Sequence, residues 1–209
     1  MKGQLRLLNG KKLKSPDNLT TRPTTSLVRE ALMNILSQEI ANSTWLDLFS
    51  GSGVIGCEVL QKGASSVVAI ESNKKTYRIC QENLKSIASA MGKESTVQSI
   101  NCEVRKWLKL GHKKQKERYD QLIPQNGFDF VYLDPPYKMN IYTSVLNDLL
   151  AGNWIKNNTL VICECSINLK ITPKNEWIIN DQRFYGKTSL MFISPNQALH
   201  SLSDTDSTH

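Results

Sequence analysis

From residue 44 onward, short apolar segments alternate with segments of helical periodicity, and this alternation restricts the folds that the chain can adopt. The first five expected strands cover residues 45–49, 66–71, 96–101, 128–133 and 159–165. The expected helices between them cover residues 54–62, 73–91, 103–110 and 141–150. Because strands joined by helical crossovers run parallel, the pattern predicts an α/β fold with a mainly parallel sheet and helices on both faces. Segments 176–180 and 189–193 predict a closing antiparallel pair and bring the sheet to seven strands.

The segment before this alternation predicts a small hairpin followed by a helix. The dipeptide Asn9-Gly10 is a strong hairpin-turn signal. Apolar residues at helix spacing then occupy residues 27–36, and Thr24 or Thr25 can cap the start of that helix.

The charge of the chain indicates its partners. The formal net charge of +7 and the sequence pI of about 9.1 predict attraction to polyanions, and nucleic acid is the first to consider. We expect a basic N-terminal arm over residues 1–23, a main domain over 24–194 and a disordered Ser/Thr/Asp-rich tail over 195–209. A polar stretch without periodicity also interrupts the main domain at 111–127.

Several protein classes are disfavoured. No run approaches the roughly 18 to 20 apolar residues of a membrane span, and the start of the chain lacks the apolar core of a signal peptide. We therefore expect a cytoplasmic protein that does not bind a membrane. The five cysteines form no C-x-x-C pair and there are only three histidines, so we expect reduced cysteines and no metal site.

A glycine-rich turn follows the first expected strand. Gly51, Gly53 and Gly56 match G-x-G-x-x-G, and Glu71 follows about twenty residues later at the end of the next strand, a pattern typical of dinucleotide sites. However, Asp47 at the strand end would repel a pyrophosphate and would suit the cationic amino end of a methionine moiety. The pattern therefore favours S-adenosylmethionine, with Glu71 on the ribose hydroxyls. A plain strand-to-helix turn with packing glycines is the alternative.

Glu103 follows the third expected strand. An acid at this place can meet the adenine amino group of the cofactor, or it can be an exposed glutamate in the first turn of a helix. The sequence leaves both interpretations open.

The run Asp134-Pro135-Pro136-Tyr137 ends the fourth expected strand. The lone pair of an exocyclic amino group on a base is delocalised into the ring, so two acceptors, one for each N–H, help to localise it. Asp134 can supply one acceptor and the Pro135 carbonyl the other, while the prolines stiffen the backbone. Tyr137 offers a flat face on which a base can stack. A proline-stiffened turn without chemistry is the alternative, but both motifs would meet at one edge of the sheet.

Together, these motifs resemble those of amino-group methyltransferases, including Phe49 within the run Asp47-x-Phe49-x-Gly51-x-Gly53. The flanking blocks are more specific, and they are similar to the signature of the RsmD family. These blocks are Asn9-Gly10-Lys11-Lys12-Leu13, Arg22-Pro23-Thr24-Thr25, Val28-Arg29-Glu30-Ala31-Leu32 with Asn34, and Tyr185-Gly186-Lys187-Thr188-Ser189-Leu190. The resemblance covers about residues 3–193.

The resemblance implies a Rossmann-like class I S-adenosylmethionine-dependent methyltransferase that acts on N2 of a guanine in 16S ribosomal RNA of the small subunit. It implies cofactor contacts from Asp47, Phe49, Gly51, Gly53, Glu71 and Glu103, and catalytic roles for Asp134, Pro135, Pro136 and Tyr137. Arg22, Thr24 and Arg29 are expected near the target base. We expect a monomer.

The chain departs from the family pattern in three places. Ser26-Leu27 stands where the family often has Asp-Arg, and position 103 is Glu where Asp or Asn is usual. The segment 111–126 looks longer than usual for the family.

Other functions fit parts of the pattern. A DNA adenine-N6 methyltransferase uses the same motif but usually carries a target-recognition segment that a chain of 209 residues has little room for. A methyltransferase that acts on a glutamine of a release factor is a further alternative, because the lone pair of the side-chain amide nitrogen is likewise delocalised. A non-catalytic RNA-binding assembly factor would not need the intact motifs, and a nicotinamide dehydrogenase is disfavoured by Asp47.

Overall fold

The computed structural model describes residues 4–16, 25–92, 96–136 and 141–198. The strands are β1 (Thr44–Leu48), β2 (Ser66–Glu71), β3 (Val97–Asn101), β4 (Phe128–Leu133), β5 (Ile155–Ser166), β6 (Trp177–Tyr185) and β7 (Thr188–Pro195). The helices are α1 (Ser26–Ile35), α2 (Val54–Gln61), α3 (Lys74–Ser89), α4 (Val104–Leu108), α5 (His112–Arg118) and α6 (Tyr142–Ala151).

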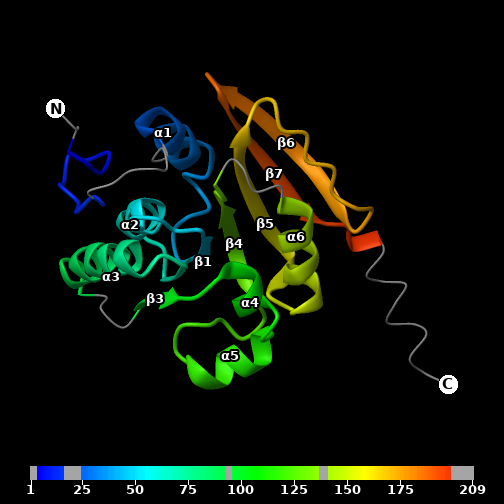
Figure 1. Ribbon diagram of the computed structural model, residues 1–209, viewed down its shortest axis with the longest axis horizontal. Coiled ribbons are helices and arrows are strands. Elements are labelled where there is room, and N and C mark those ends of the chain that lie inside the picture. The colour runs from blue at the N-terminus through cyan, green and yellow to red at the C-terminus, as the bar shows by residue number, and fades with distance from the viewer. Residues whose placement is uncertain (1–3, 17–24, 93–95, 137–140, 199–209) are drawn as a thin grey trace.

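The strands form a seven-stranded sheet in the order β3-β2-β1-β4-β5-β7-β6 (Figure 1). The first five strands are parallel, and β7 is antiparallel to both β5 and β6. The predicted mainly parallel sheet with a closing antiparallel pair is thus confirmed. Neighbouring strands β1 and β4 are separated in sequence by β2 and β3, so the order of strand addition reverses between them. In open α/β sheets, such a reversal is where ligands bind.

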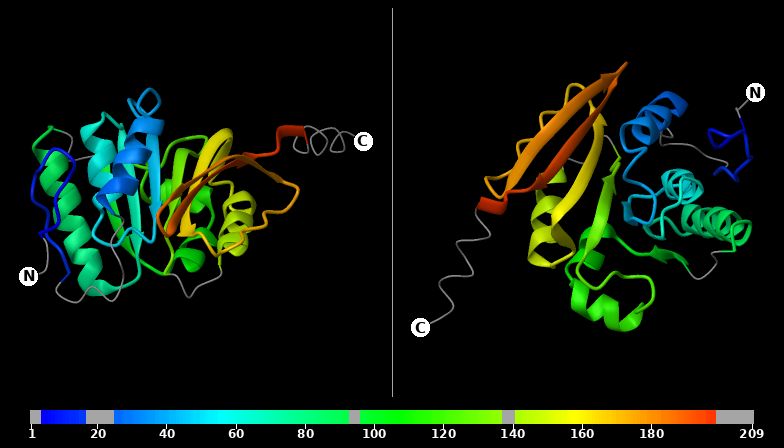
Figure 2. Two further views of the ribbon diagram at one scale, coloured as in Figure 1. Left: turned by 90° about the horizontal axis from the view of Figure 1, so that it is seen from above. Right: turned by 180° about the vertical axis from the view of Figure 1, so that it is seen from behind.

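Each face of the sheet packs against its own helices, as the view along the sheet shows (Figure 2). Helices α1, α2 and α3 cover one face, where Trp45 of β1 stacks on Phe130 of β4 with ring centroids 4.5 Å apart. Helices α4 and α6 cover the other face, where Trp107 stacks on Trp154 at 4.0 Å. Because successive strand residues point to opposite faces, the buried parallel strands are apolar on both sides.

The polar stretch at 111–127 contains a helix, α5, that the sequence did not predict. His112 explains why it forms. Its backbone N–H donates to the Gly152 carbonyl at 2.8 Å, its Nε2 lies 2.8 Å from the Pro124 carbonyl, and its ring meets the edge of Trp154. Tertiary contacts of His112, not an apolar periodicity, hold this short helix, whose other buried residue is the polar Gln115.

The N-terminal hairpin packs against the main domain. Residues Arg6 and Lys12 pair across it, and Gly10 in the turn has a φ of +86°, as the Asn9-Gly10 signal predicted. Leu7 and Leu13 are both buried in the cluster that also contains α1, α2 and α3. The hairpin therefore shares a core with the domain that follows it. Residues 17–24 of the expected arm and 199–209 of the expected tail lie outside the described residues.

A buried ion pair fastens this hairpin to two helices. Arg29 of α1 and Glu58 of α2 pair at a site where their side chains are 5% and 3% exposed. Arg29 also donates to the Arg6 carbonyl at 2.9 Å, and the Leu8 N–H donates to Glu58 Oε1 at 3.0 Å. A buried ion pair is retained only when hydrogen bonds compensate its desolvation, and the hairpin backbone supplies two of them.

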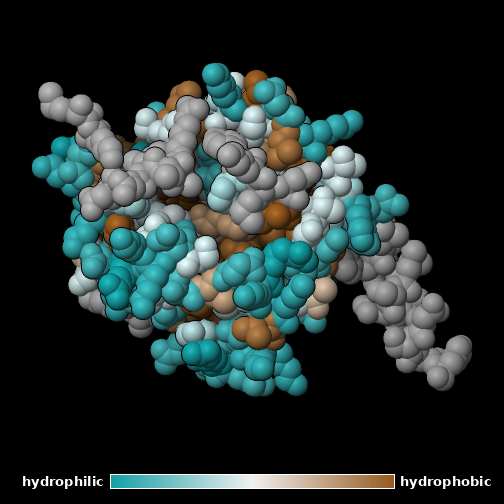
Figure 3. Space-filling model, in the orientation of Figure 1, coloured by the Kyte–Doolittle hydropathy of each residue, from teal (hydrophilic) through white to brown (hydrophobic). Residues whose placement is uncertain are grey.

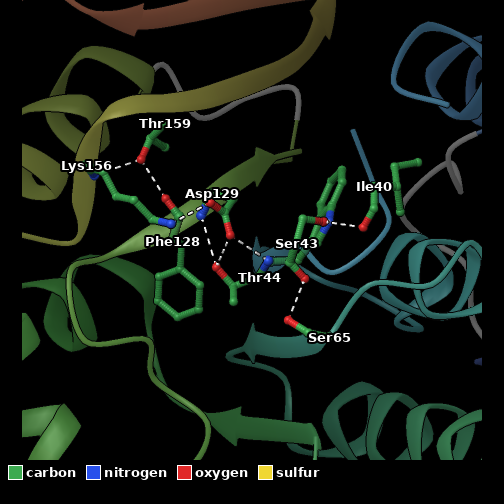
Figure 4. A network of polar contacts seen from close by, with 9 residues as sticks. Ile40, Ser43, Thr44, Ser65, Phe128, Asp129, Lys156 and Thr159 are labelled. Carbon is green, nitrogen blue, oxygen red and sulfur yellow. Dashed lines mark hydrogen bonds and ion pairs between the residues drawn. The ribbon is translucent and has the colours of Figure 1, made fainter. Parts of the chain in front are cut away.

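Opposite the carboxyl ends of the strands, a polar network joins β1, β4 and β5 (Figure 4). Asp129 Oδ2 accepts hydrogen bonds from the Thr44 N–H at 2.9 Å and the Thr44 hydroxyl at 2.7 Å, while Lys156 pairs with Oδ1. The Thr159 hydroxyl donates to the Phe128 carbonyl. Burial alone would raise the pKa of Asp129, but the Lys156 ammonium and the Thr44 donors lower it below its usual range.

The outer edge of the antiparallel pair is β6. Its register with β7 shifts between Ile179 and Asp181, which is a bulge. Ile178, Ile179 and Phe184 are exposed apolar residues on this strand, and Arg183 pairs with Asp181.

Helices of the described residues are all too short or too polar to cross a membrane.

Replacing Asp129 with alanine should lower the free energy of unfolding by about 1–3 kcal/mol, because Thr44 and Lys156 lose a shared acceptor. Urea unfolding of both proteins measures the difference. The matched control is Asp120→Ala, since the Asp120 side chain is 80% exposed in a surface pair with Lys116. The control should change stability by less than about 0.5 kcal/mol, and equal losses in the two variants would contradict the role of the network.

Candidate active site at the carboxyl ends of β1 and β4

The glycine turn after β1 adopts a conformation that its glycines permit. Gly51 and Gly53 have φ values of +53° and +75°, and Phe49 just before them has a φ of +65°. A Cβ at Gly53 would lie 2.8 Å from Cys80 Sγ, so α3 excludes a side chain there. Gly53 is also the N-cap of α2 and offers no side chain to its N–H groups. The first turn of α2 therefore presents backbone donors next to the turn.

Glu71 at the end of β2 borders this turn. Its Oε2 accepts the Gly51 N–H at 3.0 Å, and its Oε1 accepts the Asn73 N–H at 2.7 Å. Burial raises the pKa of Glu71 above its usual value, although these N–H donors oppose the shift. Asn101 at the end of β3 donates to the Glu71 and Ser72 carbonyls at 2.8 and 2.9 Å, which fixes the same strand end. A carboxylate has further lone pairs and can accept two hydroxyl groups in addition.

Asp47 lies within β1, and its carboxyl group faces the Gly56 N–H of α2. Its side chain is 2% exposed, and its Oδ2 has no hydrogen-bond partner within the described parts of the chain. Burial raises the pKa of Asp47 to about 8, while the Gly56 N–H lowers it and the neighbouring Glu71 raises it further. A buried carboxylate oxygen without a donor fits a ligand that brings a positive or hydrogen-bonding group.

Glu103 is the N-cap of α4. Its two carboxylate oxygens accept the N–H groups of Arg105 at 3.0 Å and Lys106 at 2.8 Å. It thus precedes the first turn of the helix and caps it, and it stays partly exposed. A contact with adenine is still a prediction for this residue.

The second motif lies on the neighbouring strand. Leu48 of β1 pairs in register with Leu133 of β4, so Asp134 and Pro135 leave the sheet beside the glycine turn. Asp134 is half-buried, Pro135 is buried and Pro136 is exposed. Tyr137 lies outside the described residues.

Buried hydroxyls brace the segment that carries Asp134. Tyr132, two residues earlier, donates its hydroxyl to the Glu164 carboxylate, and Tyr142 at the start of α6 donates to the Glu164 backbone carbonyl at 2.6 Å. Both ends of the segment are therefore tied to β5. Sequence reasoning missed this network because its members read as ordinary strand and helix residues.

The expected substrate contacts are only partly described. Arg22 and Thr24 lie outside the described residues. Arg29 differs from the expectation, because its guanidinium is buried against Glu58 and the hairpin backbone rather than facing an open site. The structure thus assigns Arg29 a role in packing the hairpin, in place of the expected contact with a base.

Metal-ligand groups and cysteines complete the description of reactive side chains. The residues that the structure describes contain no group of three or more His, Cys, Asp or Glu side chains arranged to hold a metal ion. All five cysteines are free, and Cys102 alone is not buried.

The architecture is that of the Rossmann-like methyltransferases. The solved structure of yhhF from Escherichia coli, a proposed methyltransferase, superposes with a TM-score of 0.73 at 25% identity and covers 93% of this chain and 99% of its own. The glycine turn after the first strand and the acidic-proline motif after the fourth occupy neighbouring strand ends in this fold.

The chain belongs to the family described as conserved hypothetical protein 95, the RsmD family, whose model matches residues 3–194. It is 33% identical over 165 residues to ribosomal RNA small subunit methyltransferase D of Buchnera aphidicola, covering 78% of this chain and 75% of that protein. It is 31% identical over 193 residues to the Haemophilus influenzae protein of the same name, covering 90% and 92% of the two chains.

We expect Asp47→Asn to flatten the pH dependence of thermal stability in the ligand-free protein. The pKa of Asp47 is about 8 in the folded chain and about 3.9 in an unfolded one. The folded chain holds this proton more tightly, so the contribution is full below about pH 4 and is lost as the pH rises through about 8. Melting temperatures across this range test the effect, with the surface change Glu39→Gln as control. A variant that keeps the wild-type slope would refute the assignment.

Gly53→Ala should abolish or strongly weaken cofactor binding, because its Cβ meets Cys80 Sγ and displaces the turn. Gly10→Ala is the control, since Gly10 also has a positive φ but has open space around its Cβ position. Both changes should cost about 1–2 kcal/mol of stability through backbone strain. Calorimetric titration with S-adenosylmethionine separates them, and near-normal affinity of the Gly53 variant would contradict the site.

Proposed function

We propose that this protein uses S-adenosylmethionine to methylate the exocyclic N2 amino group of a guanine in 16S ribosomal RNA of the small subunit. The observation that carries the proposal is the register of β1 and β4. The pairing of Leu48 with Leu133 sets a glycine turn beside Asp134 and Pro135. A transfer between two bound reactants needs this proximity more than it needs any single strong interaction.

The proposed cofactor site uses the polar groups of the first three strand ends. The turn at Gly51 and Gly53 would admit the close approach of the methionine moiety, and Glu71 would accept the ribose hydroxyls. Asp47 precedes the turn on β1 and has a buried oxygen without a hydrogen-bond partner among the described residues, which fits a cationic amino group. Phe49 would contact the ligand at the strand end, and Glu103 would lie near the adenine. When bound, the cofactor supplies an electrophilic methyl group on a positively charged sulfur.

The chain's own contribution to the reaction is to prepare the amino group. Asp134 and the Pro135 carbonyl would each accept one N–H of the guanine amino group, which localises the nitrogen lone pair and directs it at the methyl group. Pro135 and Pro136 restrict the backbone so that these acceptors keep their positions. Tyr137 would stack on the base, which must leave any helical stack to enter the site. The hydrogen bonds from Tyr132 and Tyr142 to Glu164 hold the strand end that carries Asp134 against β5.

The proposed RNA contact involves the hairpin and the segment that follows it, within the arm over residues 1–23. Arg6, Lys12 and Lys14 are exposed on the hairpin. The face of the molecule in Figure 3 is hydrophilic over the neighbouring α3, where Lys75 and Arg78 are exposed. Such a surface would bind phosphates and give an affinity that falls with salt. Relatives named ribosomal RNA small subunit methyltransferase D support ribosomal RNA as the partner and hence a cytoplasmic location.

The test is a methyl-transfer assay with labelled S-adenosylmethionine on small subunits that lack the modification, on naked 16S RNA and on unmethylated DNA. Nucleoside analysis should find N2-methylguanosine from a ribosomal substrate. Asp134→Ala should reduce the rate by at least about 100-fold while it keeps cofactor affinity, because it removes one acceptor.

Asp120→Ala, which changes an exposed aspartate that belongs to neither motif, is the control and should keep the wild-type rate. N6-methyladenine in the DNA would instead identify a DNA enzyme, and transfer by Asp134→Ala at the wild-type rate would refute the proposed chemistry.

A further inference from the structure

One buried side chain bridges the N-terminal hairpin and the glycine turn. Asn83 of α3 is 3% exposed. Its Oδ1 accepts the Lys14 N–H at 2.9 Å, and its Nδ2 donates to the Lys14 carbonyl at 3.0 Å and to the Ser52 carbonyl at 2.9 Å. Lys14 is the last residue of the hairpin, and Ser52 lies between the two glycines of the turn. The amide therefore contacts both segments with three hydrogen bonds.

On the side of the turn, Asn83 fixes one peptide group. The carbonyl of the Ser52–Gly53 peptide faces Asn83, and the N–H of the same peptide donates to the Ser50 carbonyl at 2.8 Å. The orientation of this peptide is thus set from both ends. Because Gly53 is the N-cap of α2, the orientation also sets the direction of the first backbone donors of that helix.

On the side of the hairpin, Asn83 fixes Lys14, the last residue of the hairpin. The hairpin is also held at Arg6 by Arg29 and at Leu8 by Glu58. Both peptide groups of Lys14 that flank its Cα bind the same side chain. A displacement of the hairpin at Lys14 therefore acts directly on Asn83 and, through it, on Ser52.

We propose that Asn83 is a positioning residue that couples RNA binding by the hairpin to cofactor binding at the glycine turn. This inference rests on the proposed function. RNA bound to the exposed Arg6, Lys12 and Lys14 side chains holds the end of the hairpin in place, which stabilises the orientation of Asn83 and hence of the turn. Linkage is reciprocal, so bound cofactor strengthens RNA binding by the same factor.

The experiment measures this factor in the full-length protein with S-adenosylhomocysteine and small subunits that lack the modification. The dissociation constant of S-adenosylhomocysteine is determined without subunits and with saturating subunits. The wild-type ratio should be about 5-fold or more, the usual lower range for coupled sites. Asn83→Ala removes all three hydrogen bonds, and Asn83→Asp keeps the acceptor for the Lys14 N–H while it removes the amide donors. Both should bring the ratio close to one.

The control is Ser86→Ala, an exposed residue three positions along the same helix, which should keep the wild-type ratio. A purely structural role for Asn83 would lower the melting temperature and leave the ratio unchanged in folded variants, which would overturn the proposal. A wild-type ratio of one would overturn it as well. Failure of the wild-type protein to methylate the subunits would refute the proposed function itself, and that assay distinguishes the two failures.

A measurement on the wild-type protein needs no variant to fold. S-adenosylhomocysteine should slow amide hydrogen exchange at Lys14, whose N–H binds Asn83, as well as at the turn. The Leu7 N–H donates to the Lys11 carbonyl at 2.9 Å within the same hairpin and does not bind Asn83, so the Leu7 amide serves as the internal reference. Protection confined to the turn would contradict a connection through Asn83.

Discussion

The reversal of strand order between β1 and β4 is the constraint on which the site depends. Parallel neighbours end at the same edge of the sheet, so residues that are far apart in sequence meet there without any special contact between them. The pairing of Leu48 with Leu133 is enough to bring the turn after β1 next to Asp134. The remaining polar contacts fix the two sides of this edge. Glu71 and Asn101 form hydrogen bonds at the ends of β2 and β3. On the other side, the Tyr132 and Tyr142 hydroxyls donate to Glu164 of β5.

The N-terminal hairpin is attached to the main domain by both apolar and polar contacts. Its buried leucines, Leu7 and Leu13, join the core, but apolar packing alone does not fix an angle or a register. The hydrogen bonds to Glu58, Arg29 and Asn83 fix them, because each bond requires its donor and acceptor at a defined distance and direction. The cost of burying an ion pair beside α2 is offset by these backbone contacts. A basic surface segment is thereby connected to the interior of the domain.

The sequence predicted the elements whose signals are local. Apolar runs and turn glycines gave the seven strands and the turn at Gly51 and Gly53, and their strand-end positions gave the site edge. It did not predict partners that only the fold brings together, such as Glu58 for Arg29 across 29 positions. Helix α5 was missed because one buried histidine holds it and its other side chains are mostly charged. The polar network around Glu164 and the three hydrogen bonds of Asn83 were also missed, because no sequence pattern marks an amide or acid that the fold will bury.

The outer strand β6 has a consequence for the behaviour of the protein in concentrated solution. An edge strand offers backbone donors and acceptors to another strand. The exposed side chains of Ile178, Ile179 and Phe184 add an apolar surface that favours association with other chains. The bulge after Ile179 breaks the regular spacing of those groups, and the paired charges of Asp181 and Arg183 would have to lose water if another strand were added. Both features are ways in which natural sheets resist edge-to-edge aggregation. The bulge that interrupts the pairing of β6 with β7 thus also helps to prevent a further strand from adding to β6.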